Sequence, residues 1–183
     1  MAEKLSMREK VGFSLGDSAA NFIFQTLMLL QLSFYTDSFG ISAAAAGWLF
    51  LVARLCGAVF DPIVGVLADR TETRWGKFRP WILWTALPFG IIGFLAFTTP
   101  DFGPTGKIIY AYITYILLLS VYSANNVPYA ALSGVITGDM AERNSLISVR
   151  FIFVTLATIA IQGFALPMVN HFGEGNSAKG YQI

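Results

Sequence analysis

Five long apolar segments, separated by short polar connections, dominate the pattern of hydrophobic and polar residues along this chain of 183 residues. A helix needs about 20 mainly apolar residues to cross the hydrocarbon core of a bilayer, and each segment reaches that length. The pattern therefore predicts an all-α membrane protein of about five transmembrane helices. The predicted helices cover residues 11–35, 43–68, 80–99, 108–132 and 146–170.

Positive charge is concentrated on alternate connections between these segments. Eight cationic residues precede the first segment or fall in the second-to-third and fourth-to-fifth connections, whereas the opposite side has only Lys107 and Lys179. The positive-inside rule then predicts a cytoplasmic N-terminus. The charged connection at 69–79 is interpreted as a loop that sets topology and helix packing, not as a catalytic site. Its motif residues are Asp69, Arg70, Arg74, Trp75, Gly76 and Lys77.

Several polar side chains lie inside the predicted helices. A charge at the bilayer centre costs about 2.5–3.5 kcal/mol on insertion scales, so such residues usually face the bundle interior or a water-filled cavity. Asp17 and Asn21 are four residues apart and share a helix face, which Gln25 extends. Arg150, near the start of the fifth segment, could reach a carboxylate on another helix.

The second and fourth segments carry matching polar faces. Gly57 and Asp61 are four residues apart, and Arg54 is two turns before Asp61. Tyr122 and Asn126 are likewise four apart. We expect the faces of the first, second and fourth helices to line one cavity. Its amides and guanidinium would suit a polyhydroxylated solute.

A carboxylate in such a cavity, Asp61, could bind a proton or a cation and couple it to transport. Pro128 is expected to break the fourth helix locally beside Asn125 and Asn126. Other interpretations stay open. Amides in membrane helices often only hydrogen-bond neighbouring helices, Arg54 and Arg150 could extend to the interface, and Asp61 could be structural.

The composition supports a membrane protein and argues against several other classes. Only 13% of the residues are charged, against roughly 25% in soluble domains. A single cysteine and a single histidine argue against a disulfide framework and a clustered metal site. The net charge of +1 gives no indication of a nucleic-acid partner. No paired intramembrane carboxylates or nucleophile motif support an enzyme, and we expect no cofactor.

Four sequence blocks, in order, resemble a known transporter family. They are LGDSAANFIF, FYTDSFGIS, FLVARLCGAVFDPIVGVLADRTETRWGKFRPWIL and NNVPYAALSGVITGDMAERNSLISVRF. Together they are similar to the glycoside–pentoside–hexuronide:cation symporters, the melibiose permease branch of the major facilitator superfamily. The resemblance implies a sugar, glycoside or uronide solute and a bacterial inner membrane location.

The resemblance also implies roles for individual residues. Positions that match the family's solute site are Asn21, Tyr122, Asn126 and Arg150. Positions that match its cation site are Asp61 and Ser123. Apart from the resemblance, the spacing on the helices makes Asp17 and Arg54 candidate supporting polar residues.

Three of these positions depart from the family pattern. Asn21 and Asn126 replace acids, and Gly57 replaces the first of two aspartates. A sodium site that loses a carboxylate loses charge and a hard oxygen ligand, whereas one aspartate can still exchange a proton. We therefore predict proton coupling at Asp61, with sodium as the alternative.

The family's fold has twelve helices in two six-helix halves, and transport rocks one half against the other. Residues 1–183 are accordingly expected to form a partial N-terminal transmembrane domain, without the sixth helix and the C-terminal half that transport needs. The alternative to a transporter fragment is a non-transporting remnant that retains the fold.

Overall fold

The computed structural model describes residues 4–173, and all of its regular secondary structure there is helical. Five α-helices and one π-helical turn follow one another along the chain. They are α1 (Met7–Ser33), η1 (Phe34–Ser38), α2 (Ala43–Arg70), α3 (Arg79–Ala96), α4 (Pro104–Ile136) and α5 (Met140–Gly173). The predicted all-α fold is confirmed, and each predicted segment corresponds to one helix.

Local signals explain where the helices begin. The Ser6 hydroxyl accepts from the backbone N–H of Glu9, whose carboxylate accepts from the Ser6 N–H, so a capping box starts α1. The Asp139 carboxylate accepts two backbone N–H groups at the start of α5. In the α2–α3 connection, Gly76 has φ of 92°, a conformation that favours glycine.

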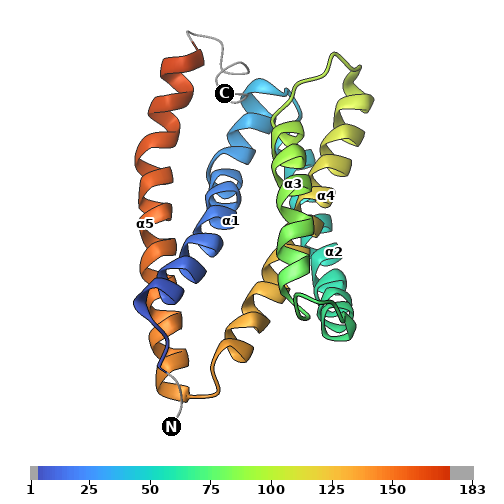
Figure 1. Ribbon diagram of the computed structural model, residues 1–183. Helices are drawn as coiled ribbons and strands as arrows, with labels where there is room; N and C mark the ends of the chain where they lie inside the picture. Colours follow the sequence, from blue (N-terminus) through green and yellow to red (C-terminus); the bar gives the residue numbers. More distant parts are fainter. Residues whose placement is uncertain (1–3, 174–183) are drawn as a thin grey trace.

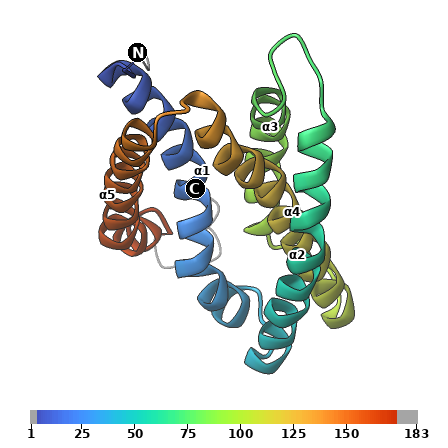
Figure 2. The ribbon, with the colours of Figure 1, turned by 90° about the horizontal axis from the view of Figure 1, so that it is seen from below.

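The helices form two groups. α1 packs chiefly against α5, whereas α4 packs against both α2 and α3. Viewed along the bundle, the α1–α5 pair lies on one side and the other three helices lie on the other (Figure 2). The start of α1, the α2–α3 connection and the α4–α5 connection share one end of the bundle (Figure 1). The clustered cations of the sequence therefore lie at a common end.

Four of the described helices are long and apolar enough to cross a membrane: α2, α3, α4 and α5. Their outward faces carry large exposed apolar side chains, including Val59, Leu87 and Phe164, as expected for contact with lipid. α1 has 27 residues but carries Lys10, Asp17 and several amides, which lower its hydropathy. A crossing by α1 stays a prediction.

The expected break at Pro128 is wrong. α4 runs without interruption from Pro104 to Ile136, and Pro128 is fully buried inside it. A proline removes one backbone hydrogen bond, but the turns on both sides keep theirs, and packing against neighbouring helices supports the chain. The asparagines beside Pro128 are therefore presented from a continuous helix.

Candidate functional site

Arg150 of α5 forms a two-pronged ion pair with Asp17 of α1. Its Nε lies 2.7 Å from one carboxylate oxygen and its Nη2 lies 3.1 Å from the other. The Asp17 side chain is 4% exposed and the Arg150 side chain 21%. Such bidentate pairs fix the relative orientation of the elements that carry them. The expectation that Arg150 reaches a carboxylate on another helix is confirmed.

Three further polar contacts join α1 to α5. The Gln25 amide donates to the Thr158 hydroxyl at 3.1 Å. Lys10 Nζ donates to the Ser145 hydroxyl and pairs with a Glu142 oxygen, both at 2.8 Å. Together with the pair formed by Asp17 and Arg150, these contacts define a polar α1–α5 interface whose charges and amides are matched.

The expectation that the α1 polar face joins a cavity with α2 and α4 is therefore wrong. Asp17 and Gln25 face α5, where Arg150 and Thr158 satisfy them. Asn21 donates to the backbone carbonyl of Asp17 in its own helix. A buried polar group is costly unless it is hydrogen-bonded, so the α1 polar face packs where α5 offers partners.

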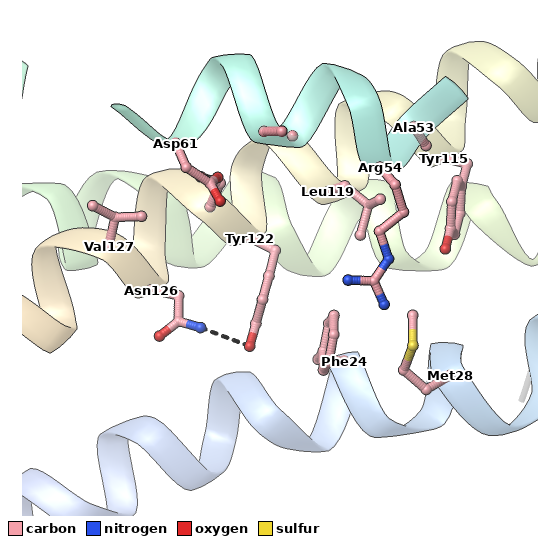
Figure 3. Close-up of a pocket in the computed structure, with 13 residues that line it drawn as sticks. Phe24, Met28, Ala53, Arg54, Asp61, Tyr115, Leu119, Tyr122, Asn126 and Val127 are labelled. Carbon is pink, nitrogen blue, oxygen red and sulfur yellow. Dashed lines mark hydrogen bonds between the residues drawn. The ribbon is translucent and has the colours of Figure 1, made fainter. Parts of the chain in front are cut away.

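A cavity of about 320 Å³ nevertheless lies between α1, α2 and α4, and we call it the central pocket. α1 contributes only Phe24 and Met28 to its wall. Figure 3 shows the pocket from the side, with α1 facing the other two helices. The pocket is lined by Phe24, Met28, Ala53, Arg54, Gly57, Ala58, Asp61, Tyr115, Leu119, Tyr122, Ser123, Asn126 and Val127.

Two pairs of polar side chains sit in the central pocket. The Ser123 hydroxyl of α4 donates to the Asp61 carboxylate of α2. One turn further along α4, the Asn126 amide donates to the Tyr122 hydroxyl at 2.7 Å (Figure 3). Tyr122 also stacks on Phe24, with ring centroids 4.2 Å apart. The carboxylate and amide groups of two helices therefore open onto one space.

Arg54 extends from α2 toward α1, beside Met28 (Figure 3). Its side chain is exposed in the pocket and forms no hydrogen bond or ion pair with residues 4–173. One turn away, Gly57 leaves open space, since a Cβ built there meets no atom within 4 Å. The pocket therefore holds a cation without a partner and room for a larger residue.

Neighbouring positions on α4 have different surroundings. The buried Asn125 donates to the Thr85 hydroxyl of α3 at 2.8 Å, so its contact joins two helices. Tyr129 donates to the backbone carbonyl of Phe13 and lies against Gly16, where a Cβ would be only 3.0 Å from its hydroxyl. Of the two asparagines that the sequence singled out, Asn126 lines the pocket and Asn125 supports packing.

The loop motif lies away from the pocket, at the cationic end. The Arg74 guanidinium stacks over the Trp75 ring at 4.7 Å, and the Thr73 hydroxyl donates to the Gly76 carbonyl. The Trp81 indole donates to the Thr71 hydroxyl and ties the start of α3 to the end of α2. Asp69 and Arg70 end α2, and Lys77 is exposed. These contacts fit the interpretation of a packing loop.

Sequence reasoning missed seven wall positions of the site: Phe24, Met28, Ala53, Ala58, Tyr115, Leu119 and Val127. Their apolar or aromatic character gave no signal that separated them from core residues. Across residues 4–173, no three His, Cys, Asp or Glu side chains are grouped to hold a metal ion. The pocket therefore offers a single carboxylate, from Asp61, among hydroxyl and amide groups.

Comparisons with known proteins agree with this architecture. A family described as MFS/sugar transport protein matches residues 12–183. The chain is 50% identical to the inner membrane symporter YicJ of Escherichia coli over 99% of its length. It is 41% identical to an isoprimeverose transporter of Lactiplantibacillus pentosus and 38% identical to a glucuronide carrier protein homolog of E. coli, over 94% and 93% of its length. The chain spans 36–39% of the length of these three relatives.

Proposed function

Because the chain belongs to the MFS/sugar transport protein family, we propose that it supplies solute and coupling-ion contacts of a secondary active transporter for a sugar, glycoside or uronide. The observation that carries the proposal is the central pocket, where the pair Asp61–Ser123 lies beside the pair Tyr122–Asn126. A titratable carboxylate and solute-binding groups in one space are what coupled transport requires.

Tyr122 and Asn126 bind solute hydroxyls in this proposal. The amide carbonyl of Asn126 accepts hydrogen bonds and its N–H groups donate them, so it can match a sugar hydroxyl in either role. Phe24, stacked on Tyr122, gives the pocket an aromatic wall against which the apolar face of a sugar ring can pack. Arg54 adds a donor fork that an anionic uronide could use.

Arg150 and Asn21 are not among the residues that line the central pocket, but the Arg150 guanidinium lies over the ring of Tyr129, three residues after Asn126 on α4. Arg150 uses two N–H groups for Asp17, and a guanidinium has five, so donors remain for a solute. Asn21 lies one turn from Asp17 on α1. We propose that the two residues contact the solute while Asp17 keeps the guanidinium in place.

Asp61 carries the coupling ion, which we propose to be a proton. Ser123 holds the carboxylate by a hydrogen bond, and Gly57 offers no second carboxylate one turn away. A hard metal cation prefers several oxygen ligands with negative charge, and this pocket has one such group. A proton needs only the one carboxylate.

The orientation that we propose places the N-terminus in the cytoplasm of a bacterial cell. The support is the cationic end of the bundle, with Arg74 and Lys77 in the α2–α3 connection and Lys10 at the start of α1. Relatives extend beyond the residues that this chain matches. Transport is accordingly proposed for this chain together with that further region.

Uptake by a joined transporter tests the proposal. The joined transporter is a fusion protein in which this chain replaces the matching segment of YicJ of E. coli. It is produced in cells that lack their own uptake of the tested solutes. Radiolabelled glycosides, pentoses and uronides are screened. Asn126→Ala should raise KM about tenfold, the equivalent of one lost hydrogen bond, while the exposed Asn144→Ala changes it little. Uptake of no solute would favour the non-transporting alternative.

A further inference from the structure

Three helices meet at Tyr129 of α4, whose residue is 4% exposed. Its ring lies against the ring of Phe13 on α1, with centroids 4.7 Å apart. The Arg150 guanidinium of α5 lies over the same ring, 5.6 Å from its centroid. Tyr129 therefore connects the α1–α5 pair to the helix that carries Tyr122 and Asn126.

The Tyr129 hydroxyl is held by the turn of α1 that leads to Asp17. It donates to the backbone carbonyl of Phe13 and accepts a hydrogen bond from the backbone N–H of Asp17. Gly16 allows this close approach, because a Cβ built there would lie 3.0 Å from the hydroxyl oxygen. Gly12, one turn earlier on α1, has open space at the corresponding position. The hydroxyl therefore fixes the Tyr129 ring relative to Asp17.

The Arg150 guanidinium has partners on two other helices. The Asp17 carboxylate of α1 accepts from its Nε at 2.7 Å and from its Nη2 at 3.1 Å. The Tyr129 ring of α4 presents its face to the cation, and the negative face of an aromatic ring attracts a guanidinium. Because the Tyr129 hydroxyl is bonded to the backbone of Asp17, the two partners are also fixed relative to each other.

This arrangement places the guanidinium close to a solute-binding group. Tyr129 follows Asn126 by three residues, which is about 4.5 Å along a helix, and residues at this spacing are neighbours on the helix surface. Asp17 uses two of the five N–H groups of Arg150, so three remain for a solute. A hydrogen bond needs a donor–acceptor distance of about 2.7–3.2 Å, so a small shift of the guanidinium would weaken such a contact.

We propose that Tyr129 is a positioning residue, which holds the Arg150 guanidinium beside Asn126 so that both residues bind the same sugar. The inference rests on the proposed function, in which Arg150 and Asn126 contact the solute. It adds a residue that acts through Arg150 without touching the solute. The ring supports the guanidinium, and the hydroxyl keeps the ring in place against α1.

Uptake by the joined transporter tests this role. The radiolabelled probes are methyl xyloside, xylose and glucuronate, and the comparison uses whichever the unmodified protein carries. Tyr129→Phe keeps the ring but loses the hydroxyl. It should raise KM about fivefold and leave the maximal rate per transporter molecule within about twofold. A purely structural role would instead reduce the number of folded molecules, which lowers the maximal rate per cell and leaves KM unchanged.

Tyr110→Phe is the matched control. The Tyr110 hydroxyl also donates from α4 to a backbone carbonyl of a neighbouring helix, that of Leu95 on α3, at 2.7 Å. Tyr110 lies 19 residues before Tyr129, far from Arg150. Loss of its hydroxyl should therefore leave KM within about twofold.

A second set of variants tests the hydroxyl contact directly. Gly16→Ala places a methyl group against the Tyr129 hydroxyl and should also raise KM about fivefold. In the Tyr129→Phe background the hydroxyl is absent, so the same alanine should change KM by less than about twofold. Gly12→Ala adds a methyl group in open space and should leave KM unchanged. An equal effect of Gly16→Ala in both backgrounds would overturn the positioning role.

The outcomes distinguish this inference from the proposed function. A raised KM in Tyr129→Phe, with the maximal rate per molecule retained and no such rise in Tyr110→Phe, supports the positioning role. An unchanged KM in Tyr129→Phe, or an equal rise in Tyr110→Phe, overturns the positioning role while the proposed function stands. If the unmodified joined transporter carries none of the three probes, both proposals fail.

Discussion

The α1–α5 interface and the central pocket contain similar charged side chains. Those of the interface form ion pairs, whereas those of the pocket have no oppositely charged partner among residues 4–173. In the interface, the guanidinium of Arg150 is paired with a buried carboxylate, and Lys10 is paired with Glu142. In the pocket, the guanidinium of Arg54 has no partner among residues 4–173, and Asp61 has only the Ser123 hydroxyl. Matched charges join helices, whereas unmatched charges remain available for a solute or an ion.

This contrast assigns different consequences to chemically identical substitutions. Removing one member of a buried pair leaves an uncompensated charge, which destabilises the fold. Removing an exposed, unpaired charge affects what the pocket binds and leaves the fold nearly unchanged. Variants that affect Arg150 or Arg54 therefore test this contrast most directly.

The largest stability effect is expected for Asp17→Asn. The variant leaves the Arg150 guanidinium without its carboxylate in a mostly buried position and should lower the free energy of unfolding by about 3 kcal/mol. Unfolding of the joined transporter in mixed detergent micelles measures this loss. The double variant with Arg150→Gln should recover part of it. Arg54→Gln should stay within about 0.5 kcal/mol of the unmodified protein. Equal losses in Asp17→Asn and Arg54→Gln would break the comparison.

The second-largest effect is expected on the sodium dependence of solute uptake, through a change in the central pocket. Gly57→Asp places a second carboxylate one turn from Asp61, in space that no described atom occupies within 4 Å of the new Cβ. Two carboxylates and the Ser123 hydroxyl supply hard oxygen ligands, so sodium should stimulate solute uptake roughly tenfold more than in the unmodified protein. Gly57→Ala is the control for added volume. If uptake by Gly57→Asp does not depend on sodium, the proposal that the α2 face around Asp61 binds the coupling ion is contradicted.

The smallest effect is expected at the cytoplasmic end of the α1–α5 interface. Lys10→Met removes the ion pair with Glu142 and the hydrogen bond to Ser145, at a site closer to solvent than Asp17. The loss in unfolding free energy should be clearly smaller than that of Asp17→Asn and should shrink in high salt. Lys4→Met, at an exposed residue, should have little effect. A loss as large as that of Asp17→Asn would mean that the burial of an ion pair does not determine how much the pair stabilises the fold.

The sequence predicted the helices well, because length and hydropathy decide membrane crossing. It also predicted the faces of α2 and α4, since Arg54, Gly57 and Asp61 share the pocket wall as their spacing implies. It could not predict the partner of the α1 polar face. Spacing shows that Asp17 and Gln25 share a face, but only the packing of α1 against α5 decides what that face meets.

Two other features were beyond sequence reasoning for physical reasons. The continuity of α4 through Pro128 depends on support from neighbouring helices, which the local signal of a proline does not contain. Gln31 looked like an ordinary residue of an apolar segment. Its burial beside Tyr35 is a property of the packed helices.

The central claim is that the Asp61 carboxylate of the central pocket carries a proton with the solute. Alkalinisation of a weakly buffered medium, measured when solute is added to de-energised cells that make the joined transporter, tests this claim most directly. The account predicts a clear alkalinisation with the unmodified protein and with Asp101→Asn, an exposed aspartate of the α3–α4 connection. It predicts no alkalinisation with Asp61→Asn. A retained signal in Asp61→Asn would contradict the account.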